Sequence, residues 1–329
     1  MNTKDIPTYI VLFIVITGFG ILYNRWEQKN LEVENNQTNQ HIAQFLLNRN
    51  LTSDYDINAK PFLWIHVENE LNSRNWESFN SRSSRELNKP YIYYTIKSII
   101  KKCDKTFNIC LIDDESFPKL LSGWNHDLTR IDVTTRNKIR SLALTKVLHA
   151  YGGLLVPSSF LCNRNLSDLY YKNVNDNGMF ACEKLDKTAY TTQTRYIPDL
   201  TFMGCKRNNS HMKEFITFLE IMLSKDFTSE SDFKDSACKY LSNLVNNKEI
   251  NLINGQMIGK KDAQNNIVDL ERLFNTEFIE FVDEMFGIYI PDKELSKRTH
   301  YNWFLKLNHE QLLNSDMIVC KYMLTSNDD

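Results

Sequence analysis

The 329-residue chain contains few residues that interrupt regular structure, with only 10 glycines and 7 prolines. This scarcity argues against a barrel of many short strands joined by tight turns, and against a low-complexity chain. Neither sign of charge predominates, because 39 Lys and Arg residues nearly balance 41 Asp and Glu residues, for a net charge of −2. Nucleic-acid binding through bulk positive charge is therefore not expected.

Several common catalytic and binding motifs are absent as well. The chain has no P-loop, no GxGxxG, no GxSxG and no HExxH. Its seven cysteines are scattered, and no CxxC pair or His-Cys cluster suggests a zinc site. We expect reduced and mostly buried thiols, with an oxidising compartment and one or two disulfides as the alternative.

One long uncharged run stands near the N-terminus, residues 6–24, with the sequence IPTYIVLFIVITGFGILYN. About 19 helical residues span the roughly 30 Å of a bilayer core. Tyr9, Tyr23 and Trp26 lie near the two ends, where interfacial aromatics are common. A buried core helix should show a polar stripe, and this run shows none. A cleaved signal peptide should have a basic start and an A-x-A site, but Asp5 offsets Lys4 and no such site follows. We therefore predict a retained single-pass membrane helix and membrane localisation.

The rest of the chain divides into a polar segment and one globular part. No repeat and no linker rich in Pro, Gly or Ser interrupts the globular part. The basic residues flanking the span are too evenly distributed to orient it. The predicted organisation is an N-terminal tail (1–5), the membrane helix (6–24), a polar stem (25–59) and one working domain (60–329).

Apolar runs and helical patterns alternate along the working domain. Runs typical of buried strands occupy 60–67, 107–112, 154–156, 179–183, 200–204 and 287–291. Helical patterns start at Asn88-Lys89-Pro90, with Asn88 as the cap, and near 165, and cover 135–151, 210–224 and 231–245. This alternation predicts an α/β fold with a mostly parallel central sheet.

Gly152 and Gly153 connect the predicted helix 135–151 to the strand 154–156. Two residues are few for reversing the chain, so at least one glycine should adopt a positive φ. Pro157 follows and is expected to terminate the strand. We assign these three residues a structural role.

Polar residues follow two of the predicted strands. Asp113 and Asp114 come directly after 107–112, and Ser158 and Ser159 follow Pro157. Ligands of open parallel sheets sit beyond the carboxyl ends of strands. The aspartates either contact a metal or a ribose, or cap the next helix, and the sequence does not separate these two interpretations.

The run from Arg140 through YGGLLVPSSFLC to Leu169 resembles glycosyltransferases with a sugar-binding DxD region and the related capsular-polysaccharide-synthesis proteins. Those families adopt a nucleotide-sugar-binding fold of the GT-A type. A first strand with Trp64 and His66, followed by the Asn-Lys-Pro-Tyr helix, also fits, so the resemblance covers roughly 60–205. It implies an enzyme that, if active, moves a sugar from a nucleotide donor to a glycan or a lipid-linked acceptor, and the predicted helix 6–24 would anchor it to a membrane.

The resemblance also implies a place for each part of the donor. Its phosphates are expected near Arg140, Ser158 and Ser159, unless Arg140 belongs to a solvated helix face. The nucleoside is expected near His66 and the pair Asp113-Asp114.

Two carboxylates flank later strands and are candidates for the catalytic base. Glu183 closes the predicted strand 179–183, and Asp199 precedes 200–204. Either would take the proton of the acceptor hydroxyl if the reaction inverts configuration.

The chain departs from the family at its metal site. The two family aspartates fall on Pro157 and Ser159, and the family's helix Asp and Arg fall on Ser141 and Leu144. Carboxylates hold Mn²⁺ or Mg²⁺ against the donor diphosphate, and neither Pro nor Ser supplies that charge. We therefore expect no resident metal and no other cofactor. The alternative function is an inactive, membrane-anchored pseudoenzyme that binds glycan or a protein partner.

The membrane helix can be tested by fractionation. Full-length protein should pellet with membranes and resist carbonate extraction, because the apolar run is buried in the bilayer. The chain lacking residues 1–29 serves as the control and should be soluble. Full-length protein in the soluble fraction would contradict the span.

Overall fold

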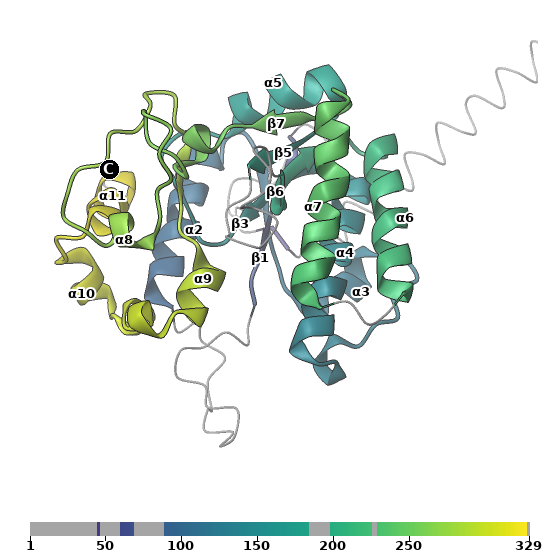
Figure 1. Ribbon diagram of the computed structural model, residues 1–329, viewed down its shortest axis with the longest axis horizontal. Helices are drawn as coiled ribbons and strands as arrows, with labels where there is room; N and C mark the ends of the chain where they lie inside the picture. The colour runs from purple at the N-terminus through teal and green to yellow at the C-terminus, as the bar shows by residue number, and fades with distance from the viewer. Residues whose placement is uncertain (1–44, 47–59, 69–88, 184–197, 226–228, 328–329) are drawn as a thin grey trace, which may run out of the picture. The chain divides into compact units, whose positions relative to one another are not determined.

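The computed structural model describes residues 45–46, 60–68, 89–183, 198–225 and 229–327 (Figure 1). All of them fall within the unit 45–329. The predicted tail (1–5), the predicted membrane helix (6–24) and all of the predicted stem except residues 45–46 lie outside the described residues. In the described part of the chain, no helix has both the length and the apolarity that a bilayer span requires.

Six strands form the central sheet, in the order β2-β1-β3-β6-β5-β7. Three of the five neighbouring pairs are parallel, namely β1–β2, β1–β3 and β5–β7, while β6 runs antiparallel to both β3 and β5. The predicted α/β fold with a mostly parallel sheet is confirmed. The strands are β1 (Phe62–His66), β2 (Asn108–Ile112), β3 (Gly153–Pro157), β5 (Met179–Glu183), β6 (Pro198–Cys205) and β7 (Asn251–Ile253).

Helices cover both faces of this sheet. Figure 1 shows α4, α6 and α7 side by side, and α2 across the sheet from α4. The helices are α2 (Pro90–Cys103), α3 (Phe117–Leu120), α4 (Val133–Tyr151), α5 (Ser167–Asn177), α6 (Ser210–Ser224), α7 (Glu230–Asn246), α8 (Leu270–Leu273), α9 (Asp292–Lys297), α10 (His309–Leu313) and α11 (Ile318–Asn327). Pro90 begins α2 as predicted, but the residue at the cap position is Lys89 and not Asn88.

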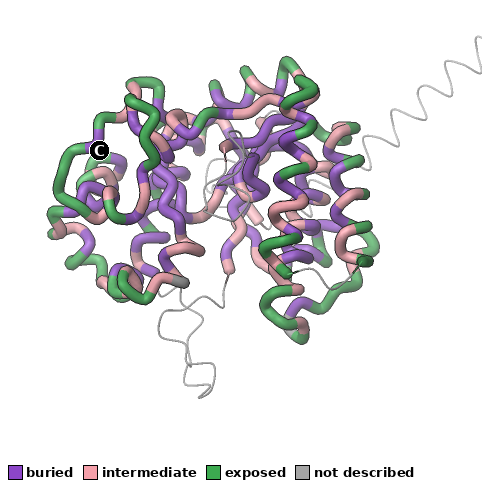
Figure 2. The backbone as a smooth tube through the Cα atoms, in the orientation of Figure 1, coloured by how far each residue is buried: buried purple, intermediate pink, exposed green. Residues whose placement is uncertain are grey.

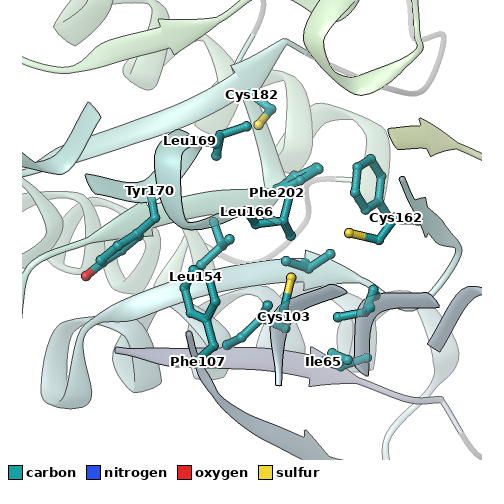
Figure 3. Packing of buried hydrophobic residues seen from close by; sticks show 14 of the residues in the cluster. Ile65, Cys103, Phe107, Leu154, Cys162, Leu166, Leu169, Tyr170, Cys182 and Phe202 are labelled. Atoms are coloured by element: carbon teal, nitrogen blue, oxygen red, sulfur yellow. The ribbon is translucent and has the colours of Figure 1, made fainter. Parts of the chain in front are cut away.

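An apolar core lies between the sheet and the helices α2 and α5. Leu154 and Phe202 from the strands meet Cys103 of α2 and Leu169 and Tyr170 of α5 (Figure 3). Figure 2 shows the strands buried and the outer turns of the helices exposed. All seven cysteines are free and buried, as expected for reduced thiols in a core.

The C-terminal third forms a second apolar cluster against α2. Tyr91 and Ile92 of α2 pack with Ile288, Phe304 and other residues of this third. The predicted strand 287–291 exists as β8 (Gly287–Tyr289), but it lies outside the central sheet and pairs with β4 (Phe160–Cys162). The sequence did not predict β4, β7 or the helices after α7, because short segments carry little periodicity.

The turn between α4 and β3 has the predicted backbone. Gly152 adopts a φ of 70° and Gly153 a φ of 104°. A Cβ on Gly153 would lie 2.2 Å from the carbonyl oxygen of Phe62 in β1. Pro157 was expected to follow the strand and terminate it. It is instead the last residue of β3, and it lies opposite His66 of β1.

Substitution of Gly153 by Ala should therefore cost more than the backbone strain alone. Gly123 supplies the matched control, since its φ is 75° and a Cβ there would meet nothing within 4 Å. Gly123→Ala should cost about 1 kcal/mol, or about 2–4 °C in Tm. Gly153→Ala should cost about 2 kcal/mol more, because the methyl group overlaps β1. Equal Tm values in a thermal melt would contradict the close approach.

Candidate functional site

The carboxyl ends of β1, β2 and β3 meet at one edge of the sheet. Because β1 lies between β2 and β3, and α2 and α4 cover opposite faces, this edge contains a change in strand order. Open α/β sheets bind ligands at such a place.

A pocket with a cavity volume of about 110 Å³, partly open to solvent, lies at this edge. The described residues that line the pocket are His66, Val67, Glu68, Lys89, Ile92, Asn137, Arg140, Ser141, Leu144, Leu155, Val156, Pro157, Ser158, Ser159, Thr201, Tyr289, Asp292 and Lys293.

The pocket brings together four of the residues predicted to bind the donor. His66 ends β1, Arg140 projects from α4, and Ser158 and Ser159 follow β3. The hydroxyl of Thr95 in α2 donates a 2.6 Å hydrogen bond to the carbonyl oxygen of Ser158. This bond ties the end of β3 to α2.

Arg140 is held by Asp114, which follows β2. Arg140 Nε donates to the two carboxylate oxygens of Asp114 at 2.8 and 3.0 Å. His66 Nε2 lies 3.1 Å from Asp114 Oδ1, and the His66 ring stacks on Phe117 with centroids 5.5 Å apart. Only 5% of Arg140 is exposed, which excludes the alternative that this side chain lies on a solvated face of its helix.

These contacts shift the titration of Asp114. Burial by itself would raise the pKa of its carboxyl group. Hydrogen bonds from His66 and Arg140, together with the Arg140 charge, outweigh burial and lower the pKa to about 2. Asp114 therefore remains ionised over the whole neutral and mildly acidic range.

Asp113 caps a helix, which is one of the two roles that the sequence left open for the aspartate pair. Its side chain accepts a 2.6 Å hydrogen bond from the Ser116 hydroxyl, and its N–H donates to that same hydroxyl at 3.1 Å. This reciprocal pair caps the short 3₁₀ helix η2 (Asp114–Ser116). The two neighbouring aspartates thus differ, one capping a helix and one paired with an arginine.

Glu183 and Asp199 are both engaged by neighbouring groups. Glu183 accepts a 2.8 Å hydrogen bond from the Gly255 N–H and lies 2.5 Å from Lys261 Nζ. Asp199 accepts from the N–H and the hydroxyl of Thr201, each at 2.6 Å. Thr201 lines the pocket, whereas the two carboxylates are not among its described lining residues. Their catalytic role stays a prediction.

The pocket also contains charged residues that the sequence analysis missed. Lys89 is 4% exposed, and its Nζ lies 2.8 Å from both carboxylate oxygens of Asp292. Asp292 also accepts a hydrogen bond from the Tyr91 hydroxyl. Burial first, and then the Asp292 charge, raise the Tyr91 pKa well above its usual value. Asp292 stands in the first turn of α9, which acidic residues favour, but no sequence pattern predicts its pairing with Lys89.

Among the described residues of this edge, the two positions that the resemblance assigns to metal ligands carry no carboxylate. Pro157 offers no side-chain ligand, and Ser159 is neutral and only 2% exposed. Two nearby carboxylates, Asp114 and Asp292, are already bound by cationic side chains. Among the described residues, no group of three or more His, Cys, Asp and Glu is arranged to hold a metal.

The Asp114 ion pair should make stability depend on pH. The folded-state pKa lies below the unfolded value of 3.8, so the stabilisation is complete above about pH 5 and is lost as pH falls toward 2. Asp114→Asn should cost about 2 kcal/mol at pH 7, and this difference should shrink between pH 5 and pH 3 in urea titrations.

Asp176→Asn, at an exposed position of α5, is the control and should change stability by less than about 0.5 kcal/mol. A cost of Asp114→Asn that stays constant from pH 7 to pH 3 would contradict the lowered pKa.

Comparisons with known proteins show a distant similarity to a solved structure. No family model matches the chain, and no curated protein matches it. A crystal structure of the galactosyltransferase LgtC in complex with donor and acceptor sugar analogues aligns with 52% of this chain and 68% of that chain. The two share 12% sequence identity at a TM-score of 0.30. This similarity does not assign the chain to a family.

Proposed function

We propose that the pocket at the ends of β1 and β3 binds a nucleotide sugar, and that the protein is a glycosyltransferase with a GT-A-like fold. The observation that carries this proposal is the convergence of His66, Arg140, Ser158 and Ser159 on one pocket. The pocket lies where an α/β sheet binds ligands. The order of helix, Tyr-Gly-Gly and strand, seen as α4, Gly152-Gly153 and β3, agrees with the resemblance in the sequence.

The lining suits a ligand that carries both hydroxyl and phosphate groups. Arg140 and Lys293 offer positive charge, while Ser158, Asn137 and Thr201 offer neutral polar groups. Sugars are bound through many hydrogen bonds to such groups, and phosphates through Arg and Lys.

Transfer would break the bond between the anomeric carbon and the donor phosphate oxygen. A new bond would form from that carbon to an acceptor hydroxyl oxygen, and the nucleotide would leave with the bonding electrons. The acceptor proton would pass to a carboxylate if configuration inverts. Glu183 and Asp199 are the candidates from the sequence, and Asp292 adds a carboxylate that lines the pocket. The acceptor would be a glycan or a lipid-linked acceptor, and the predicted helix 6–24 would anchor the domain to a membrane.

A second candidate function is binding without transfer. Two observations favour it: the neutral residues Pro157 and Ser159 at the family's metal positions, and the pairing of Asp114 and Asp292 with cations. An inactive relative would retain the pocket and use it to hold a glycan or a protein partner.

Calorimetry with a panel of UDP-, GDP- and CMP-sugars, with EDTA or with Mn²⁺, tests the proposal. We expect at least one nucleotide sugar to bind, and Mn²⁺ alone to leave Tm unchanged, because the site lacks its carboxylates. Binding together with sugar transfer or donor hydrolysis would support the enzyme. Binding without turnover for any donor would support the second candidate, and no binding of any nucleotide sugar would contradict the enzyme.

Two tryptophan variants locate the ligand. Ser141 lines the pocket and Thr217 lies exposed on α6, and each hydroxyl donates to the carbonyl four residues earlier in its helix. Ser141→Trp should weaken binding by about tenfold or more, because the indole fills the pocket. Thr217→Trp should leave binding unchanged. Equal affinities for the two variants would place the ligand elsewhere.

A further inference from the structure

Glu68 lies between two cationic side chains from different parts of the chain. Its Oε2 is 3.7 Å from Arg140 Nη1, and its Oε1 is 3.8 Å from Lys293 Nζ. Both separations are within ion-pair range but longer than a hydrogen bond. Both cations therefore lie near the Glu68 carboxylate without forming a hydrogen bond to it.

This loose arrangement differs from the other ion pairs at the pocket. Asp114 and Asp292 meet their cations at hydrogen-bond distance, as described above. Glu68 and Lys293 remain partly accessible, with 19% and 30% of their side chains exposed. A ligand can therefore reach the space between Arg140 and Lys293.

Arg140 is oriented for a ligand before one arrives. Its Nε is fixed by Asp114, and its Nη1 lies 3.2 Å from Asn137 Oδ1 on the side of Glu68. A guanidinium held along one edge loses little freedom when another edge binds an oxyanion. Lys293 also interacts with Glu230 at the start of α7, and Glu230 is in turn bound by Lys234 and Asn137.

We propose that Arg140 and Lys293 bind the diphosphate of the donor in place of a divalent ion, and that the Glu68 carboxylate occupies this anion site until the diphosphate displaces it. The inference rests on the proposed function and specifies its donor site. Glu68 competes with the ligand because two anions at one pair of cations repel each other. Pro157 and Ser159 carry no carboxylate that would bind a metal ion, so Arg140 and Lys293 supply the positive charge instead.

Titration of inorganic pyrophosphate in EDTA, followed by calorimetry, tests this site without assuming a nucleoside. Glu68→Gln should tighten binding by about threefold or more, because it removes the competing charge. Lys293→Gln should weaken binding by about tenfold or more. Arg140 is left unchanged, since its buried pair with Asp114 makes any variant a test of folding. Both effects should shrink as salt is raised.

Two remote charge changes serve as matched controls. Glu277→Gln and Lys306→Gln alter the same charges at exposed positions of the C-terminal third, and each should leave the affinity within about twofold of the natural protein. Unchanged or weaker binding by Glu68→Gln, or a loss in Lys306→Gln equal to that in Lys293→Gln, would overturn the inference. No pyrophosphate binding by either the natural protein or Glu68→Gln would overturn it as well.

The inference and the proposed function can fail separately. Nucleotide sugars that bind the natural protein, with no effect of Glu68→Gln or Lys293→Gln on pyrophosphate, would leave the function standing and reject the anion site. Pyrophosphate binding with the expected variant effects, but no nucleotide-sugar binding, would support the anion site and reject the function.

Discussion

The ion pair between Asp114 and Arg140 organises the edge of the sheet at which the pocket opens. A guanidinium that is only 5% exposed is costly to bury unless its donors are satisfied. Asp114 satisfies one edge of it, and His66 approaches the same carboxylate. The Asp114 carboxylate, two residues beyond the end of β2, thus connects the last residue of β1 and the middle of α4.

Much of the central sheet was predictable, because its signals are local. The buried strands β1, β2 and β5 are short apolar runs, and a strand covered on both faces needs apolar residues at every position. Gly152 and Gly153 predict the turn between α4 and β3, since few other residues adopt a positive φ without strain. The carboxyl ends of parallel strands share one edge, so His66, Asp114 and Ser158 could be placed together before any coordinates.

The rest of the site could not be predicted, because it depends on pairs distant in the sequence. Lys89 and Asp292 are separated by 203 positions, and no periodicity links two such residues. Glu68 and Lys293 are separated even further along the sequence, and each alone resembles an ordinary surface charge. Asp113 and Asp114 are neighbours with identical chemistry, and only the position of Arg140 separates the helix cap from the ion pair. Sequence resemblance ended near residue 205, whereas the pocket is completed by residues 289–293.

The small sheet of β4 and β8 has a consequence for biosynthesis. It joins residues 160–162 to residues 287–289, and the Ile290 N–H donates to the Ser159 carbonyl oxygen at 3.2 Å. Contacts this distant along the chain form late in folding, since a long loop must close first. The pocket also needs Tyr289, Asp292 and Lys293 from this later part of the chain. The binding site is therefore complete only after residues 287–293 have been synthesised, and a product that stops before them would carry most of the central sheet without it.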